Sequence, residues 1–159
     1  MALKSEAFEI RRLGRKDAVL AQQLFRLFQE VFEEEPTSAG TSYLKRLLGK
    51  PDFFVYAAFC EKEIVGGLTA YELPKYYSEC SEMFIYDIAV KSEFQRQGLG
   101  KMMLETLQAY CRQQGIKEMF VAANEEDAQA VAFYRTTEGI AEKVLHFTYP
   151  TARTDENVL

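Results

Sequence analysis

The stretch Met83–Gly100 reads MFIYDIAVKSEFQRQGLG, and it decides the fold. Its first part, Met83–Val90, is apolar enough to form a strand, and its last part carries two glycines before an amphipathic segment, Lys101–Gln114. Glycine lets the backbone approach an anion closely, and a helix start presents unpaired N–H groups and the positive end of the helix dipole. The stretch therefore predicts a strand, a turn and a helix that together suit a pyrophosphate.

Two familiar glycine motifs do not fit this stretch. A dinucleotide-binding fold asks for Gly-x-Gly-x-x-Gly, and a P-loop asks for Gly-Lys-Ser/Thr after four spacer residues, and neither is present. Arg96 and Lys101 instead add positive charge around the glycines. Taken alone, two glycines between a strand and a helix could also serve tight packing, so the surrounding sequence has to decide.

A second motif follows about thirty residues later. A strand-like run at 118–123 is followed by Asn124, then by a helix-like run at 128–134 that ends in Phe133-Tyr134, then by Gly139. In this order the two motifs resemble GNAT N-acetyltransferases, whose acetyl-CoA motif reads Gln/Arg-x-x-Gly-x-Gly/Ala after a strand. The resemblance implies acetyl-CoA as the donor.

Hydrophobic periodicity and turn residues predict the remaining elements. Strands are expected at 8–13, 53–59, 64–71, 81–90, 117–123 and 141–149, and helices at 17–32, 42–48, 101–114 and 128–137. This order matches the GNAT core. We therefore expect an α/β (α+β) fold with a mixed central sheet, splayed between its fourth and fifth strands and flanked by helices, as a single domain over 1–159.

Composition narrows the classes of function. With 19 Lys and Arg against 24 Asp and Glu the formal charge is −5, which disfavours nucleic acid and favours cationic partners. The sequence shows no signal peptide and no run of about 18 apolar residues, so we expect no membrane association and a cytoplasmic protein. Three widely spaced cysteines and one histidine predict neither a disulfide framework nor a metal site.

The resemblance assigns the donor side mainly to backbone atoms. N–H groups at Gln97, Gly98, Leu99, Gly100 and Lys101 would hold the pyrophosphate. The backbone of Ile88, Ala89 and Val90 would pair with the pantetheine arm, and an N–H near Ile88 would meet the oxyanion. Gln95, Arg96 and Asn124 complete the expected donor site, although Asn124 would equally serve a simple turn.

Two side chains are the candidate catalytic groups. Asp87 is a carboxylate inside an apolar strand, which is costly to bury unless it is paired or faces a cleft. We interpret it as the base or as an anchor for the substrate ammonium, against the alternative of a hydrogen-bonded core carboxylate. Tyr134 matches the tyrosine that commonly protonates the leaving thiolate in GNAT enzymes, and its alternative is core packing.

The segments around Leu73-Pro74-Lys75 and Ile85-Tyr86-Asp87 further resemble aminoglycoside 3-N-acetyltransferases of GNAT type. That resemblance spans about residues 41–149 and implies the 3-amino group of gentamicin-like antibiotics as acceptor, with antibiotic resistance as the outcome. The enzymes it points to are often dimers, so a homodimer is compatible with it. Candidate substrate-binding residues, besides Asp87, are Glu35, Tyr77, Glu79, Glu82, Glu125, Glu126, Asp127 and His146.

Several of these residues could have a purely structural role, since acidic runs are usually solvated and a single histidine is usually structural. Two alternative functions also stay open. One is a GNAT acetyltransferase of another small amine, such as a polyamine, and the other is a non-catalytic acyl-CoA-binding module.

Overall fold

The computed structural model describes residues 7–152, which form two compact units divided between Ala122 and Ala123. Residues 1–6 and 153–159 lie outside the described residues. The single domain over 1–159 stays a prediction.

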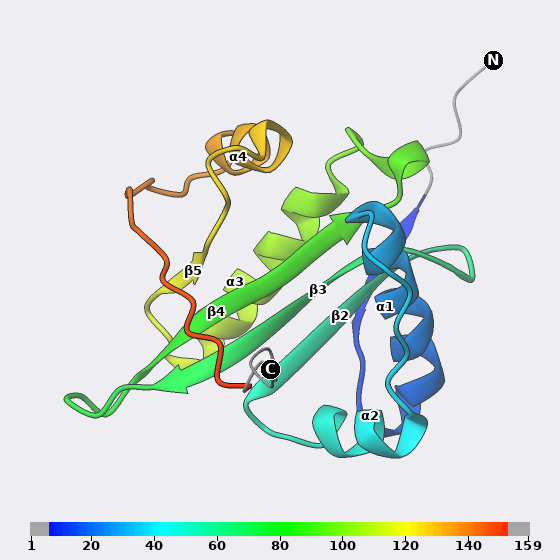
Figure 1. Cartoon of the computed structure of the whole chain (residues 1–159), viewed down its shortest axis with the longest axis horizontal. Coiled ribbons are helices and arrows are strands. Elements are labelled where there is room, and N and C mark those ends of the chain that lie inside the picture. The colour runs from blue at the N-terminus through cyan, green and yellow to red at the C-terminus, as the bar shows by residue number, and fades with distance from the viewer. Residues whose placement is uncertain (1–6, 153–159) are drawn as a thin grey trace, which may run out of the picture. The chain divides into compact units, whose positions relative to one another are not determined.

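A five-stranded sheet organises the first unit (Figure 1). The strands lie in the order β1 (Phe8–Arg12), β2 (Phe53–Cys60), β3 (Glu63–Pro74), β4 (Ser81–Val90) and β5 (Met119–Val121). The first four pair antiparallel and β5 pairs parallel with β4. That last pairing ends at Ile85 and Val121, while β4 continues to Val90. The mixed sheet and the divergence of its fourth and fifth strands are as predicted.

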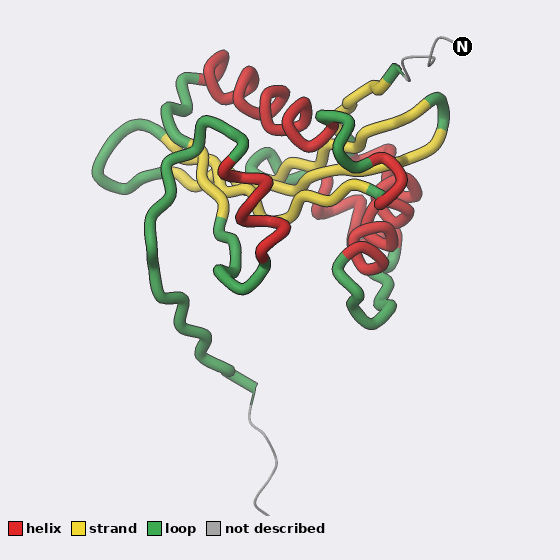
Figure 2. The backbone as a smooth tube through the Cα atoms, turned by 90° about the horizontal axis from the view of Figure 1, so that it is seen from above, coloured by secondary structure: helices red, strands yellow, loops and turns green. Residues whose placement is uncertain are grey.

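Helices cover both faces of this sheet. Figure 2 shows α3 (Leu99–Gln114) on one side and α1 (Ala18–Val31) with α2 (Thr41–Leu48) on the other. α1 buries its apolar stripe, including Leu24 and Phe28, against the sheet. A Cβ on Gly67 would lie 2.6 Å from Leu24 Cδ1 and 2.6 Å from Tyr56 O, so the close approach of α1 requires glycine there.

The α3 face has its own core. Phe54, Leu68, Met83 and Ile85 are fully buried on the sheet, and α3 contributes Leu99, Met103 and Leu107. Short 3-10 turns at Arg15–Asp17 and Ser92–Phe94 precede α1 and α3, respectively. Observed bounds differ from the predicted ones by at most three residues at either end, mostly in strands: β3 runs on to Pro74, and β5 is limited to three residues.

The second unit is smaller, and its C-terminal part corrects one prediction. α4 (Ala128–Arg135) begins at Asp127, whose carboxylate accepts a hydrogen bond from Ala130 N at 3.0 Å. The strand predicted at 141–149 is wrong: within the described chain these residues form no strand and no backbone hydrogen bond. Alternating apolar residues favour a strand, but a strand exists only where a partner satisfies its N–H and C=O groups.

Candidate functional site

A β-bulge in β4 decides which side chains share a face of the sheet. Asp87 pairs with Thr69, whereas Ile85 pairs with Ala70, so Tyr86 is an extra residue in the ladder. Simple alternation would place Tyr86 and Asp87 on opposite faces. With the bulge, both belong to the face that carries Thr69 and α1, because Tyr86 packs against Tyr71 on that face.

Asp87 is half-buried on this face. Burial, and then the negative charge of Glu34, raise the pKa of the Asp87 carboxyl above its ordinary value. Glu34 lies in the connection between α1 and α2, so a second carboxylate acts on Asp87 from a different part of the chain. The negative charge of Glu34 beside the Asp87 carboxyl makes this a site that favours a cation.

Aromatic rings lie on the same face of the sheet as Asp87. The ring centroid of Tyr86 lies 5.8 Å from that of Tyr71 and 5.8 Å from that of Phe84, both edge to face, and Phe84 stacks on Phe120 at 5.0 Å. We call these four residues the aromatic cluster. Tyr86 remains 60% exposed and Phe120 39% exposed, so their rings are available to a ligand. Burial, followed by the nearby Tyr86, Tyr43, Asp87 and Asp52, raises the pKa of the Tyr71 phenol.

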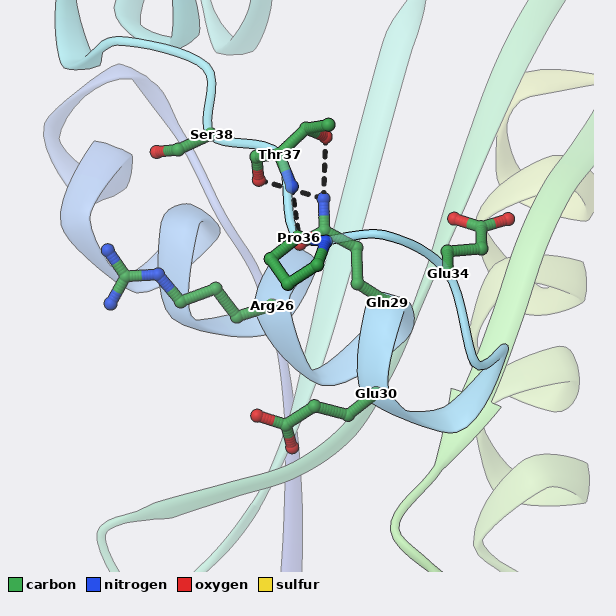
Figure 3. A pocket seen from close by; sticks show the side chains of 7 residues that line it. All are labelled: Arg26, Gln29, Glu30, Glu34, Pro36, Thr37 and Ser38. Carbon is green, nitrogen blue, oxygen red and sulfur yellow. Dashed lines mark hydrogen bonds between the residues drawn. The ribbon is translucent and has the colours of Figure 1, made fainter.

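The connection that holds Glu34 is anchored to α1. Gln29 Nε2 donates to Thr37 O and to Thr37 Oγ1, each at 2.8 Å, and Thr37 N donates back to Gln29 Oε1 at 3.3 Å. These residues border a cavity of about 270 Å³ whose other lining residues are Arg26, Glu30, Glu34, Pro36 and Ser38. Figure 3 shows the Glu34 side chain pointing away from the Gln29–Thr37 contact. The anchored connection therefore presents Glu34 in a defined position.

The turn before α3 is shaped by backbone conformation. Arg96 and Gly98 have φ angles of 61° and 82°, and nothing lies within 4 Å of where a Cβ on Gly98 would be. Gln95 Nε2 donates to Val90 O at 2.9 Å, which ties the turn to the end of β4. Within the described residues, no side chain caps the start of α3, so its first N–H groups have no side-chain acceptor at the N-cap. This geometry suits an anion held by backbone N–H groups.

The backbone of Ile88, Ala89 and Val90 lies in the part of β4 beyond its last β5 partner. These residues pair with β3 on one side only. Their other edge belongs to the diverging part of the sheet, where an extended ligand could add as a strand. The residues predicted for the donor side in the first unit thus lie between the end of β4 and the first turn of α3.

The predicted acidic substrate residues occupy several places. Glu35 neighbours Glu34, but Tyr77, Glu79 and Glu82 lie at the opposite end of β4, and Glu82 is roughly 16 Å along the strand from Asp87. Lys75 Nζ lies 3.8 Å from Glu82 and 5.8 Å from the Tyr77 ring centroid. The structure of the first unit thus places Glu35 next to Glu34 in the α1–α2 connection, and the other three in the β3–β4 turn or at the start of β4.

The remaining candidates belong to the second unit. Asn124 Oδ1 accepts from Glu126 N at 3.1 Å, which is the turn expected as its alternative role, and Asp127 caps α4. Glu125 pairs with Lys143 at 3.0 Å. The Tyr134 ring packs against Phe133 at 5.1 Å, and His146 is exposed. The roles proposed for these residues stay predictions.

Sequence reasoning missed Glu34, Tyr71, Tyr86 and Tyr43. Nothing in the run Glu33-Glu34-Glu35 distinguishes its middle residue, and the bulge that turns Tyr86 toward Asp87 leaves no clear pattern in one sequence. Within the described residues, no group of three His, Cys, Asp or Glu side chains is arranged to hold a metal. No described helix is long and apolar enough to cross a membrane.

Comparison with known proteins identifies relatives of this architecture. A family model described as acetyltransferase (GNAT) family matches residues 21–138. An aminoglycoside acetyltransferase, meta-AAC0020, from an uncultured soil metagenomic sample was solved in complex with sisomicin. It is 39% identical, with a TM-score of 0.88 over 91% of this chain and 97% of that one.

Two further proteins are similar to this chain, one in fold and one in sequence. Aminoglycoside N-acetyltransferase AAC(6')-Iy in complex with CoA has a TM-score of 0.78 over 96% of this chain and 100% of that one; at 15% identity it shares the fold alone. The [ribosomal protein bS18]-alanine N-acetyltransferase of Salmonella typhimurium is 31% identical over 78 residues. That match covers 49% of this chain and 53% of the Salmonella enzyme, so the chain spans about half of that relative.

Proposed function

Because the chain belongs to the GNAT acetyltransferase family, we propose that it acetylates aminoglycosides, at the 3-amino group of their 2-deoxystreptamine ring. The observation that carries this proposal is the 39% identity, over 91% of the chain, to an acetyltransferase solved with sisomicin. The half-buried Asp87, on the sheet face that also carries Tyr71 and Tyr86, supports it, because a carboxylate binds an ammonium and flat rings suit the carbon-rich face of a sugar.

Acetyl-CoA is the donor in this family, and it supplies an activated acetyl thioester. The backbone atoms predicted to bind acetyl-CoA are arranged in a way that suits it. The open turn at Gly98 and the uncapped start of α3 suit the pyrophosphate, and the free edge of Ile88–Val90 suits the pantetheine arm. We assign the N–H groups of residues 97–101 and the backbone of residues 88–90 to these contacts.

Asp87 acts on the acceptor amine in this proposal. The acceptor is an ammonium at neutral pH and must lose a proton before its nitrogen can form the new C–N bond. Asp87 anchors that ammonium and takes up the proton at its carboxylate oxygen. The raised pKa of Asp87 brings the carboxyl closer to the pH at which an efficient proton acceptor works.

The second proton transfer concerns the C–S bond that breaks. The departing thiolate needs a proton, and we assign its donation to the Tyr134 hydroxyl, which regains a proton from water. The nitrogen loses two protons in all: Asp87 takes the first and releases it to water, and the second leaves as the C–N bond forms and balances the proton that water returns to Tyr134. The net change is transfer of the acetyl group to nitrogen, of one proton to sulfur and of one proton to water. Asn124, Gln95 and Arg96 are assigned to orienting the donor.

A substrate panel tests the proposal. Purified full-length protein is incubated with acetyl-CoA and, separately, sisomicin, gentamicin, spermidine or a peptide with an N-terminal alanine, and the released thiol is measured. We expect turnover with the two antibiotics, and NMR of the product should place the acetyl group on the 3-amino nitrogen. Acetylation at another nitrogen would overturn the regiochemistry alone.

The panel also separates three rival functions. Turnover of spermidine without the antibiotics would indicate a polyamine acetyltransferase. Preference for the peptide would favour an α-amino acetyltransferase, the activity printed for the Salmonella relative. Binding of coenzyme A by calorimetry without turnover of any amine would indicate an acyl-CoA-binding module.

A further inference from the structure

Tyr86 owes its position beside Asp87 to the β-bulge of β4. Ile85 pairs with Ala70, and Asp87 pairs with Thr69. Tyr86 between them therefore has no residue opposite it in β3. Without the bulge, the side chains of Tyr86 and Asp87 would point to opposite faces of the sheet. With it, a phenol ring and a carboxylate from consecutive residues share one face, and their Cα atoms are about 3.8 Å apart.

Two neighbouring rings fix the orientation of the Tyr86 ring. Its centroid lies 5.8 Å from that of Tyr71 on β3 and 5.8 Å from that of Phe84 on β4, and the interplanar angle is 74° in each pair. Tyr71 in turn packs against Phe53 of β2 at 5.0 Å, and Phe53 belongs to the core under α1. Because both neighbours stand nearly at right angles to the Tyr86 ring, neither of them stacks flat on its face.

Tyr86 and Asp87 together make two demands on one ligand. The Asp87 carboxylate binds an ammonium, and the flat face of an aromatic ring favours the C–H groups of a saturated ring. Since the two side chains come from adjacent residues on one face, the ammonium and the carbon ring of the ligand must also be adjacent. An amine bonded directly to a ring carbon meets both demands. A flexible chain offers no flat face and loses rotational freedom on binding.

We propose that Tyr86 is a specificity-determining residue of the acceptor site: its ring selects acceptors whose amino group is bonded directly to a saturated carbon ring, over flexible amines of the same charge. The inference rests on the proposed function, because it concerns the acceptor that Asp87 binds. It goes further in naming the residue that chooses between cyclic and open-chain amines. Charge alone cannot make this choice, since Glu34, Asp87 and the net charge of −5 attract every polycation alike.

Three diamines of equal charge test the inference by binding alone. cis-1,3-Diaminocyclohexane carries its amino groups on a ring, and cis-1,3-bis(aminomethyl)cyclohexane separates them from the ring by one carbon each. 1,3-Diaminopropane keeps the three-carbon spacing of the first diamine and has no ring. Dissociation constants are measured by calorimetry or NMR titration on purified protein saturated with coenzyme A. We expect the first diamine to bind at least about tenfold more tightly than the third, and the second to lie between them.

Variants at position 86 show whether the ring makes the choice. Tyr86→Ala should reduce the preference to within about threefold by weakening the cyclic diamine, while the affinity for 1,3-diaminopropane changes little. Tyr86→Phe keeps the flat ring and should keep the preference. Tyr86→Leu fills the space with an apolar group that has no flat face, so it should behave like Tyr86→Ala and gives the same test if the alanine variant does not fold.

The outcomes that would overturn the inference are distinct. An unchanged preference in Tyr86→Ala and Tyr86→Leu would show that another group makes the choice. Equal loss of affinity for all three diamines would indicate a purely structural role. Equal affinities in the natural protein, or no binding of any diamine, would mean that Tyr86 and Asp87 do not recognise ring and ammonium together.

Tyr76→Ala is the matched control. Tyr76 is 100% exposed in the turn between β3 and β4, so the change removes a tyrosine ring away from Asp87. We expect the preference to stay as it is, and its loss in Tyr76→Ala would refute the inference. The diamines need no turnover, so an inactive substrate panel would refute the proposed function alone. Turnover of aminoglycosides with an unchanged preference in Tyr86→Ala would refute the role of Tyr86 alone.

Discussion

Asp87 is the residue at which function and stability conflict. The fold half-buries a carboxylate that the proposed chemistry needs in its ionised form, and burial raises its pKa. Asp87 follows the bulge of β4, on the sheet face that packs against the apolar core under α1. Conflicts of this kind are common at active sites.

We expect Asp87→Asn to lower kcat by about 10² to 10⁴, because the amide can neither take up the proton nor balance the ammonium charge. Binding of coenzyme A should be unchanged by calorimetry, since the donor contacts lie in the backbone. Glu61→Gln, in the exposed turn between β2 and β3, is the control and should retain activity. Full activity of Asp87→Asn would exclude Asp87 as proton acceptor.

The same variant should be more stable than the natural chain at pH 7. Because a carboxyl whose pKa is raised in the fold destabilises the native state when ionised, a neutral amide removes that penalty. The gain in melting temperature should shrink as the pH falls through the native pKa of Asp87, where the natural side chain is protonated. A gain that is the same at pH 4 and pH 7 would mean that charge burial is not its cause.

Glu34 should control the pH at which Asp87 works. Its negative charge raises the pKa of Asp87, so Glu34→Gln should lower that pKa and move the acidic limb of the pH–rate profile toward lower pH. Glu33→Gln, at the neighbouring position, should leave the limb in place, since burial and Glu34 are the causes that raise the pKa of Asp87. A limb that does not move with Glu34→Gln would show that another group governs it.

At the scale of single elements, α3 has a glycine with positive φ at each end. Gly98 has a φ of 82° and Gly115 a φ of 72°, and no atom lies within 4 Å of an added Cβ at either position. The two positions therefore carry similar strain in the left-handed region, about 1 to 2 kcal/mol for an L-residue. They differ only in what they face, because Gly98 precedes the proposed pyrophosphate site and Gly115 ends the helix.

We expect Gly98→Ala and Gly115→Ala to lower the free energy of unfolding by comparable amounts, measured by urea denaturation. Only Gly98→Ala should also weaken the binding of coenzyme A, by at least about tenfold, because the methyl group and the strain are added directly before the N–H groups proposed to hold the diphosphate. Equal affinity in both variants would place the diphosphate elsewhere.

At the scale of the whole molecule, net charge shapes the encounter with substrate. The chain carries −5 and the proposed acceptor is a polycation, so the two attract over distances that salt shortens. We expect kcat/KM for the aminoglycoside to fall roughly tenfold as the salt concentration is raised from about 20 mM to about 500 mM, with kcat little changed. A value of kcat/KM independent of salt would show that the acidic surface does not attract the acceptor.

Much of the fold followed from local patterns. β4 begins and ends where the sequence predicts, at Ser81 and Val90, because an apolar strand bounded by polar turns is a local property. Both long helices follow from stripes of apolar residues that bury on one side. The strand predicted at 141–149 fails because pairing depends on a partner outside the segment.

The features of the candidate site also divide into those that the sequence predicts and those that only the structure shows. The sequence by itself determined the glycine turn before α3, the burial of an ionisable group at Asp87 and the excess of negative charge, since each depends on residue type and near neighbours. Only the tertiary structure decided that a bulge turns Tyr86 and Asp87 to one face, and that Glu34 is the glutamate of its run that acts on Asp87. The reason is physical: register and electrostatic coupling arise between segments far apart in the chain, and their geometry is fixed only when the sheet and its helices pack.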